Sequence, residues 1–205
     1  MANACTQDNS KLAVNFEELR IIEVRDPRSI AGQEALRLCR LIFELPAEDI
    51  RSITQNLLIP GHLFPDRVYC LAAVIGEQVV GVSVAYLLHD VKMGYLEYIA
   101  VLPEFRGGGI GNKLYRATVA ALVRDCPECS GFLFELMNIN KDLIYRKEFF
   151  LSLGAIPIDL SFYNLNPAIV RSGLKIMFHP LREGARITSP DMSKVFDNLA
   201  HVLDD

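Results

Sequence analysis

The stretch LEYIAVLPEFRGGGIGNKLY, from Leu96 to Tyr115, joins an apolar run to a proline-containing turn, an arginine, four glycines and a helix-like segment. A glycine inside a helix costs about 1 kcal/mol relative to alanine, so glycines at a helix start need a compensating role. The first turn of a helix offers N–H groups without intrahelical acceptors and the positive end of the helix dipole, and both attract phosphate. Glycine lets a phosphate approach this backbone because no Cβ stands in the way. We therefore expect a pyrophosphate cradle, with Arg106 as a cation beside it.

Two common phosphate-binding motifs do not fit these glycines. The dinucleotide fingerprint G-x-G-x-x-G fails because the sixth position is Asn112 when counted from Gly107 and Leu114 when counted from Gly109. A P-loop needs Gly-Lys followed by Ser or Thr, which this stretch lacks.

The pattern that fits is Arg/Gln-x-x-Gly-x-Gly/Ala directly after a strand, formed here by Arg106, Gly109 and Gly111. It resembles the acyl-CoA-binding signature of the GNAT superfamily of N-acyltransferases. The whole stretch from Leu96 to Tyr115 is similar to the central strand, turn and helix of that family. The order of expected elements from Leu19 to about Leu181 also follows the family, so the resemblance covers most of the chain.

Hydrophobic periodicity and turn residues predict the other elements. We expect a strand at 19–26, helices at 30–44 (with Ser29 as N-cap) and 47–58, strands at 68–75, 79–89 and 95–101, a helix at 109–124, a strand at 131–137, a helix at 142–153, and closing strands at 157–165 and 173–181. The fold class is therefore α+β: a GNAT-type mixed, largely antiparallel central sheet flanked by helices in a single domain. Its expected parts are a flexible N-terminus at 1–17, an acyltransferase domain at 18–185 and a C-terminal amphipathic helix at 186–205.

Composition limits the class of protein further. The chain has 205 residues, the length of one domain, and 51% of them are hydrophobic. A net charge of −4 and a pI near 5.6 argue against broad binding to nucleic acid. No apolar run approaches the roughly 18 residues of a membrane span, and the N-terminus lacks the features of a secretory signal. We expect a cytoplasmic protein with no membrane or nucleic-acid partner.

The five cysteines are scattered and odd in number, which favours reduced thiols over a disulfide framework. Cys126 and Cys129 form a C-x-x-C pair, but a structural zinc site needs a second Cys or His pair, and the sequence has none at a fitting spacing. We expect a turn at this pair and no metal site.

The resemblance implies where the co-substrate, acetyl-CoA, binds. The family's central strand and the next strand separate, and the pantetheine arm lies in the opening. Backbone groups at the strand end would bond this arm, and amides of the glycine turn would hold the pyrophosphate, with Arg106 nearby. The residues implied are Ile99, Ala100 and Val101 for the arm and Arg106, Gly107, Gly108, Gly109, Ile110, Gly111 and Asn112 for the phosphates.

The chemistry implied is attack of an amine on a thioester. An alkyl amine with a pKa of about 10.4 must first lose a proton, which requires a base. Glu97 is the first candidate, because it precedes Ile99 by two residues and should share its face of the strand. Glu135, on the neighbouring strand, is the second, since a carboxylate in an apolar strand needs a partner or a task.

The general acid departs from the family pattern. The family's usual tyrosine position is Phe150 here, in FFLSLGA, and phenylalanine donates no proton. Tyr145 lies five residues earlier, about 140° around the same helix, and is a candidate replacement. The leaving thiolate could also take its proton from water or from the attacking amine.

Two functions stay open. The first is an acyl-CoA-dependent N-acetyltransferase that moves an acetyl or other short acyl group to an amine. The second is a catalytically inactive acyl-CoA sensor, to which Phe150 lends support. A Rossmann-type protein would need an alternating parallel order of elements that the sequence lacks. We adopt the first, with a small-molecule or peptide amine as acceptor. The amphipathic tail could also cover a partner subunit, so a homodimer stays open.

Overall fold

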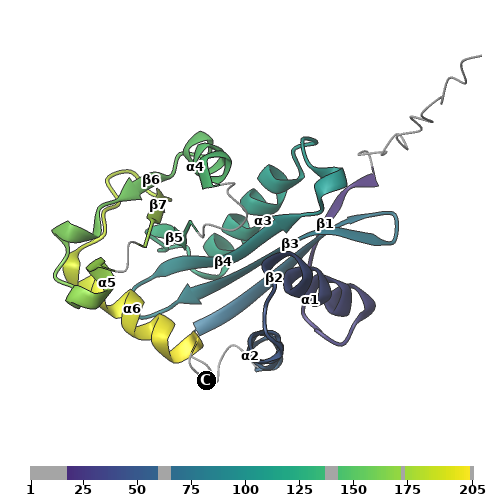
Figure 1. Cartoon of the computed structure of the whole chain (residues 1–205), viewed down its shortest axis with the longest axis horizontal. Coiled ribbons are helices and arrows are strands. Elements are labelled where there is room, and N and C mark those ends of the chain that lie inside the picture. Colours follow the sequence, from purple (N-terminus) through teal and green to yellow (C-terminus); the bar gives the residue numbers. More distant parts are fainter. Residues whose placement is uncertain (1–17, 60–65, 137–142, 172–173, 204–205) are drawn as a thin grey trace, which may run out of the picture.

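The computed structural model describes residues 18–59, 66–136, 143–171 and 174–203. Within these ranges, seven strands form one sheet in the order β1-β2-β3-β4-β5-β7-β6 (Figure 1). The strands are β1 (Arg20–Glu23), β2 (Asp66–Ile75), β3 (Gln78–Leu88), β4 (Met93–Val101), β5 (Gly131–Glu135), β6 (Ile156–Ile158) and β7 (Ile176–Pro180). The helices are α1 (Ile30–Phe43), α2 (Ala47–Leu58), α3 (Ile110–Asp125), α4 (Leu143–Ser152), α5 (Pro167–Arg171) and α6 (Ser189–Leu203).

The sheet is mixed but largely antiparallel. Five of its neighbouring pairs are antiparallel, and β4 and β5 form the parallel pair. The helix α3 connects these two strands, as a crossover between parallel strands requires. The predicted fold class is therefore confirmed.

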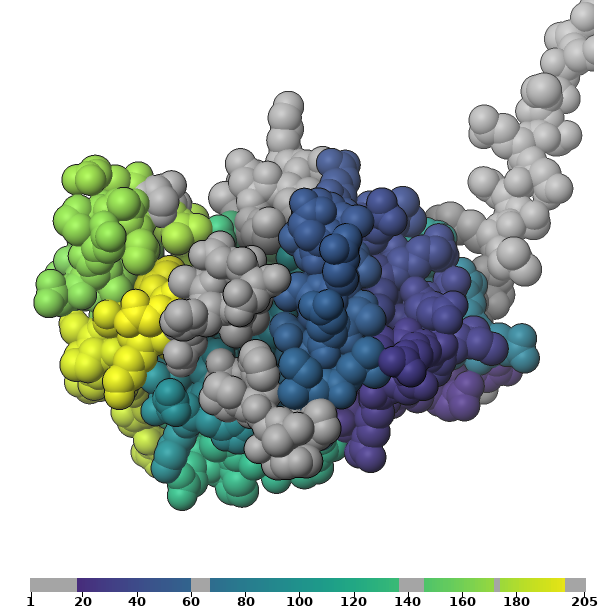
Figure 2. All heavy atoms as spheres, turned by 90° about the horizontal axis from the view of Figure 1, so that it is seen from below, coloured from purple at the N-terminus to yellow at the C-terminus, as the bar shows by residue number. Residues whose placement is uncertain are grey.

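The helices cover the two faces of the sheet separately (Figure 1). One buried cluster joins α1, α2 and α6 to one face, through residues such as Leu36, Ile53 and Met192. The other joins α3 and α4 to the opposite face, through Leu114 and Phe150. Figure 2, which looks onto the first face, shows α1 and α2 in purple to blue and α6 in yellow. Met192 and Val195 of α6 are thus buried against this chain's own sheet.

Short-range hydrogen bonds explain two of the predicted element boundaries. Ser29 caps α1, because its side-chain oxygen accepts a hydrogen bond from the Gly32 N–H at 3.1 Å. The pair Cys126–Cys129 forms the expected turn between α3 and β5, where the Cys129 N–H donates to the Cys126 carbonyl at 2.9 Å.

The strand expected at 157–165 is wrong beyond its first residues. The strand β6 ends at Ile158, and a 3-10 turn at Leu160–Phe162 and then α5 follow. Asp159 causes the change, because its side chain accepts hydrogen bonds from the backbone N–H and the hydroxyl of Ser161. Such a local bond competes with strand pairing.

Two further expectations concern membranes and metals. No helix within the described ranges is long and apolar enough to span a membrane. The described residues also contain no group of three or more His, Cys, Asp or Glu side chains arranged to hold a metal ion. Residues 1–17, expected to be a flexible N-terminus, lie outside the described ranges.

Candidate active site

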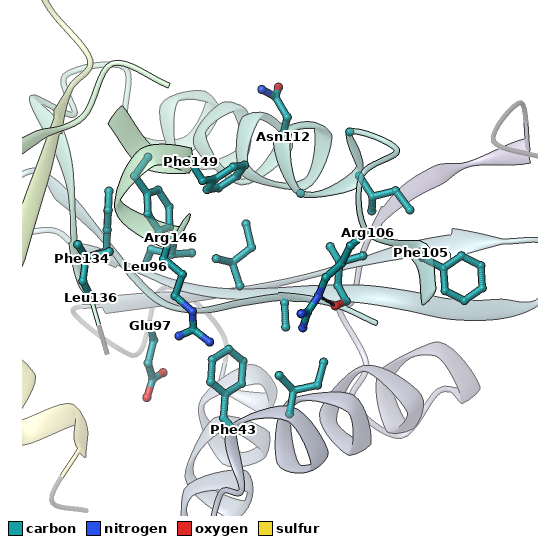
Figure 3. A pocket seen from close by; sticks show the side chains of 18 of the residues that line it. Phe43, Leu96, Glu97, Phe105, Arg106, Asn112, Phe134, Leu136, Arg146 and Phe149 are labelled. Carbon is teal, nitrogen blue, oxygen red and sulfur yellow. Dashed lines mark hydrogen bonds between the residues drawn. The ribbon is translucent and has the colours of Figure 1, made fainter. Parts of the chain in front are cut away.

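The sheet opens between β4 and β5. Their pairing begins at Met93 and Gly131 and ends at Leu96 and Phe134, whereas β4 continues to Val101 beside β3 alone. A cavity of about 500 Å³ lies at this opening (Figure 3). It is lined by β4, the glycine turn, the start of α3, the end of β5, and parts of α1 and α4. Every residue predicted to hold the co-substrate lines it except Gly108.

The strand β4 presents backbone groups to this opening. The antiparallel ladder with β3 ends in a hydrogen bond from the Leu102 N–H to the Val80 carbonyl at 2.9 Å. Bonding residues alternate along an antiparallel pair. The N–H and C=O of Ala100 therefore face β3, while those of Ile99 and Val101 face the opening. Of the three residues expected to bond the pantetheine arm through their backbones, only Ile99 and Val101 are oriented to do so.

Backbone conformation explains two of the glycines in the turn. Gly107 has φ +87° and Gly109, the N-cap of α3, has φ +75°, both in the region that side chains disfavour. A Cβ built at either position meets no heavy atom within 4 Å, so the space beside them is open. A left-handed N-cap and an open approach leave the first N–H groups of α3 available to an anion. The sequence alone suggested only the second reason for these glycines.

Arg106 is fixed to the end of β4. Its Nε donates to the Val101 carbonyl at 3.0 Å, which is the dashed line in Figure 3. This bond uses one donor of the guanidinium and holds the side chain beside the glycine turn. It also occupies the Val101 carbonyl, so the Val101 N–H is the group left to face the opening.

Glu97 occupies a β-bulge in β4. Ala85 of β3 pairs with Leu96 and Val84 pairs with Tyr98, so Glu97 has no residue of its own opposite it. Such an extra residue breaks the alternation of side chains. Ile99 lies on the α3 side of the sheet, whereas Glu97 hydrogen-bonds side chains of the other face. The expectation that Glu97 and Ile99 share a face is therefore wrong.

The carboxyl group of Glu97 is buried at the wall of the cavity. The side chains of Tyr86 and Tyr98 hydrogen-bond it, yet Oε2 has no partner among the residues that the structure describes. Burial raises the pKa of Glu97 to about 7 because it penalises the charged form, and the negative charge of Asp49 on α2 acts in the same direction. The two tyrosine bonds oppose that rise. A base with this pKa is matched to proton transfer near neutral pH.

Glu135 ends β5 at the same opening. It pairs with Ile176 of β7 and comes directly after Phe134, the last β5 residue paired with β4. Burial raises the pKa of Glu135, and its charge also raises the pKa of Tyr95 on β4. The structure thus brings both predicted carboxylates to one cavity, and Glu97 is the more deeply buried of the two.

The usual tyrosine position of the family is filled by an aromatic cluster. Phe150 is 6% exposed, and its ring centroid lies 4.1 Å from that of Phe134 and 5.0 Å from that of Phe149. None of these rings carries a proton to donate. Tyr145, the candidate replacement, belongs to α4, but its side chain lies outside what the structure describes.

The cavity side chains that sequence reasoning missed include Phe43 of α1 and Arg146 of α4. Figure 3 shows Arg146 extending from α4 into the cavity, toward Glu97 and Phe43. Arg146 and Phe150 are four residues apart and therefore share a helix face. That spacing could have indicated Arg146 once Phe150 was placed at the site.

From the sequence, five polar or aromatic residues are candidates for the acceptor pocket: His62, Asp66, Tyr86, His89 and Tyr163. Tyr86 is at the site, as a partner of Glu97. Tyr163 packs against the cluster of the α1 and α2 face and does not line the cavity, nor does His89. His62 and the side chain of Asp66 lie outside the described part of the chain.

Together these features define a class of protein: an α+β protein whose sheet opens beside a glycine-rich helix start, with a cavity at that opening. The chain matches the model of the acetyltransferase (GNAT) family over residues 34–145, more than half of its length, and it belongs to that family. The resemblance drawn from the Arg106 motif is confirmed.

Individual relatives are acetyltransferases with different acceptors in their names. The chain is 34% identical over 135 residues to N-alpha-acetyltransferase 30 of Mus musculus, a match that covers 57% of this chain and 36% of the relative. It is 27% identical over 145 residues to thialysine N-epsilon-acetyltransferase of Mus musculus, covering 64% and 82%. A solved acetyltransferase of the GNAT family from Staphylococcus aureus Mu50 superimposes with a TM-score of 0.56 over 80% of this chain and 99% of that chain, at 17% identity.

The chain spans about a third of the length of the N-alpha-acetyltransferase 30 it matches. The likeness to solved structures supports the shared fold.

Proposed function

We propose that this protein is an N-acetyltransferase that moves an acetyl group from acetyl-CoA to a primary amine. The observation that carries the proposal is Glu97, a buried carboxyl group with a pKa near 7 at the wall of the cavity that leads to the glycine turn. Burying a carboxylate is unfavourable, and groups with such shifted pKa values are concentrated at functional sites.

The co-substrate fits the described residues. The open left-handed turn at Gly107 and Gly109 and the first N–H groups of α3 suit its pyrophosphate, with Arg106 beside them. The backbone groups of Ile99 and Val101 suit the pantetheine arm, which would then run along the free edge of β4. Acetyl-CoA supplies an activated acetyl group as a thioester.

In the reaction, the amine nitrogen bonds to the acetyl carbon, the carbon–sulfur bond breaks, and sulfur leaves as a thiolate. The acceptor nitrogen loses two protons on the way to the amide. Glu97 accepts the first, which frees the nitrogen lone pair, and the second, lost as the nitrogen–carbon bond forms, passes to the departing thiolate. The acceptor arrives as a cation at neutral pH, because an alkyl ammonium has a pKa of about 10.4, so a nearby base is required.

The pH dependence follows from the state of Glu97. The base acts only when it is deprotonated, and burial raises its pKa to about 7. The value of kcat/KM should therefore rise with pH and level off above about 7, with further rise only from deprotonation of the free amine. A pH profile with an amine of low pKa separates the two effects. An acidic limb near the ordinary glutamate pKa of about 4.3 would contradict this role.

The leaving thiolate has a cation close by. Phe150 offers no proton, but the guanidinium of Arg146 extends into the same cavity and keeps its charge at all working pH values (Figure 3). We propose that this charge stabilises the negative charge that develops on the thioester and the departing sulfur. A fixed cation here supplies the electrostatic part of the missing tyrosine's task.

Changing Arg146 to methionine keeps an unbranched, flexible side chain and removes the charged guanidinium. We expect kcat to fall about 100-fold, the usual size for one donor to developing charge, while acetyl-CoA affinity changes little. Arg146→Lys should recover part of the rate. Steady-state kinetics check this. An unchanged kcat with a raised KM for the amine would instead assign Arg146 to acceptor binding.

The proposed activity is tested by following CoA thiol release from acetyl-CoA with a set of amines. The set includes a peptide with a free N-terminus and thialysine, since relatives are named for these two classes of acceptor, together with a polyamine and an aminoglycoside. Amine-dependent thiol release supports the proposal and identifies the class. Tight acetyl-CoA binding without release for any amine would favour the sensor instead.

The sensor has lost its main support. Phe150 removes one proton donor, but Glu97 and Arg146 remain at the cavity, and the relatives are named for catalytic activity. A cytoplasmic location and a homodimer stay predictions.

A further inference from the structure

Glu97 belongs to a hydrogen-bonded unit that spans three elements. The side chains of Tyr86 on β3 and Tyr98 on β4 both hydrogen-bond its carboxyl group. Burial is the main cause that raises the pKa of each tyrosine, and the charge and hydrogen bond of Glu97 act in the same direction. A tyrosine hydroxyl carries the proton that a carboxylate can accept. The side chain of Asn56 on α2 hydrogen-bonds Tyr86 and lowers its pKa, against the effect of burial and of Glu97. The unit thus runs from α2 through β3 to the bulge in β4.

The β-bulge makes this arrangement possible. Because Glu97 is the extra residue, Tyr98 pairs with Val84 and lies on the face of α1 and α2. Tyr86 is two residues from Val84 along β3 and lies on the same face. A regular strand would have placed Glu97 and Tyr98 on opposite faces. The bulge therefore brings one carboxyl group within reach of two hydroxyls.

Packing holds both tyrosines in place. Tyr86 is 2% exposed and Tyr98 is 7% exposed. The Tyr98 ring lies 4.8 Å, centroid to centroid, from Phe43 of α1, a residue that also lines the cavity. Both tyrosines therefore belong to the core on the face of the sheet that α1 and α2 cover.

We infer that Tyr86 and Tyr98 are positioning residues, which hold the carboxyl group of Glu97 so that Oε2 is the atom that meets the acceptor amine. Oε2 is buried and has no hydrogen-bond partner in the described part of the chain, and a buried polar atom in that state is costly unless a ligand satisfies it. An amine N–H is the donor it lacks. This inference rests on the proposed function, because it assigns the amine to one oxygen of the proposed base.

The test follows the titration of Glu97 in Tyr98→Phe and Tyr86→Phe. Both bonds favour the charged carboxylate, so each loss should raise the pKa of Glu97 by about one unit. The titratable or charged groups that face Glu97 stay in place: Cys39 on α1, Asp49 on α2, Tyr95 on β4, Glu135 on β5 and Arg146 on α4. Tyr95→Phe is the matched control, since Tyr95 lies on the same face of β4 and its hydroxyl is not a donor to Glu97.

The first readout is ¹³C NMR of the glutamate carboxyl groups, with the Glu97 signal identified by its loss in Glu97→Gln. The second is the pH profile of kcat/KM. The midpoint of its acidic limb should rise by the same amount, about one pH unit, so that kcat/KM at pH values below the midpoint falls about tenfold relative to wild type. Unfolding curves check that each variant is folded, and the double variant adds a further shift.

Two results would overturn the inference: an unchanged Glu97 midpoint in both folded variants, or an equal shift in Tyr95→Phe. The NMR readout needs no acceptor. A wild-type protein without turnover whose Glu97 midpoint moves as expected would therefore refute the proposed function while confirming the hydrogen-bonded unit.

Discussion

Replacing Glu97 with glutamine should lower kcat/KM by about 10² to 10⁴-fold, the range for loss of a general base. Glutamine has the shape of glutamate and can still accept bonds from Tyr86 and Tyr98, so the fold and the cavity should persist. It cannot take a proton at any working pH. The pH profile of kcat/KM should therefore lose its acidic limb near pH 7. The affinity for acetyl-CoA, measured by calorimetry, should stay within a few-fold of wild type.

Glu135→Gln is the control for this change. Glu135 lines the same cavity and its pKa is also raised by burial, but it ends β5 and is less buried than Glu97. We expect a smaller loss, below about tenfold, with the acidic limb unchanged. If Glu135→Gln were the variant that lost the limb, the two carboxylates would exchange roles.

Gly109→Ala should weaken acetyl-CoA binding at least tenfold, about 1.4 kcal/mol. Gly109 begins α3 with φ +75°, so a side chain either strains the turn or moves the N–H groups that are proposed to hold the pyrophosphate. The same strain should lower the free energy of unfolding by about 1 kcal/mol. Calorimetric titration and denaturant unfolding measure the two effects.

Gly184→Ala separates strain from binding. Gly184 has φ +73°, and a Cβ there also meets no atom within 4 Å, yet it does not line the cavity. Its substitution should cost a similar amount of stability and leave acetyl-CoA affinity unchanged. Equal affinities in the two variants would mean that the glycine turn does not hold the co-substrate.

The sequence predicted the parts of the site that depend on local backbone chemistry. The strand, the turn and the start of α3 lie where the run from Leu96 to Tyr115 placed them, because the proline fixes its own φ and the glycines allow the positive φ values that the turn requires. Ser29 identified the start of α1 for a similar reason, since a side-chain cap acts within three residues.

The parts that depend on tertiary pairing were not predictable in this way. The bulge at Glu97 has no local signature, because it arises from the register between β3 and β4. Counting alternate residues therefore placed Glu97 on the wrong face. The stretch 157–165 was likewise expected to be a strand, but the bond from Ser161 to Asp159 makes a turn there. Which face of α4 lines the cavity also depends on tertiary packing, so Arg146 was not predicted as a site residue.

The most direct measurement is mass spectrometry of the amine set after incubation with acetyl-CoA that carries ¹³C in its acetyl group, with wild type and Glu97→Gln in parallel. An N-acetyltransferase with Glu97 as base transfers the label to at least one amine in wild type, and the variant transfers far less under the same conditions. Wild-type protein that binds acetyl-CoA and leaves every amine unlabelled would contradict the account.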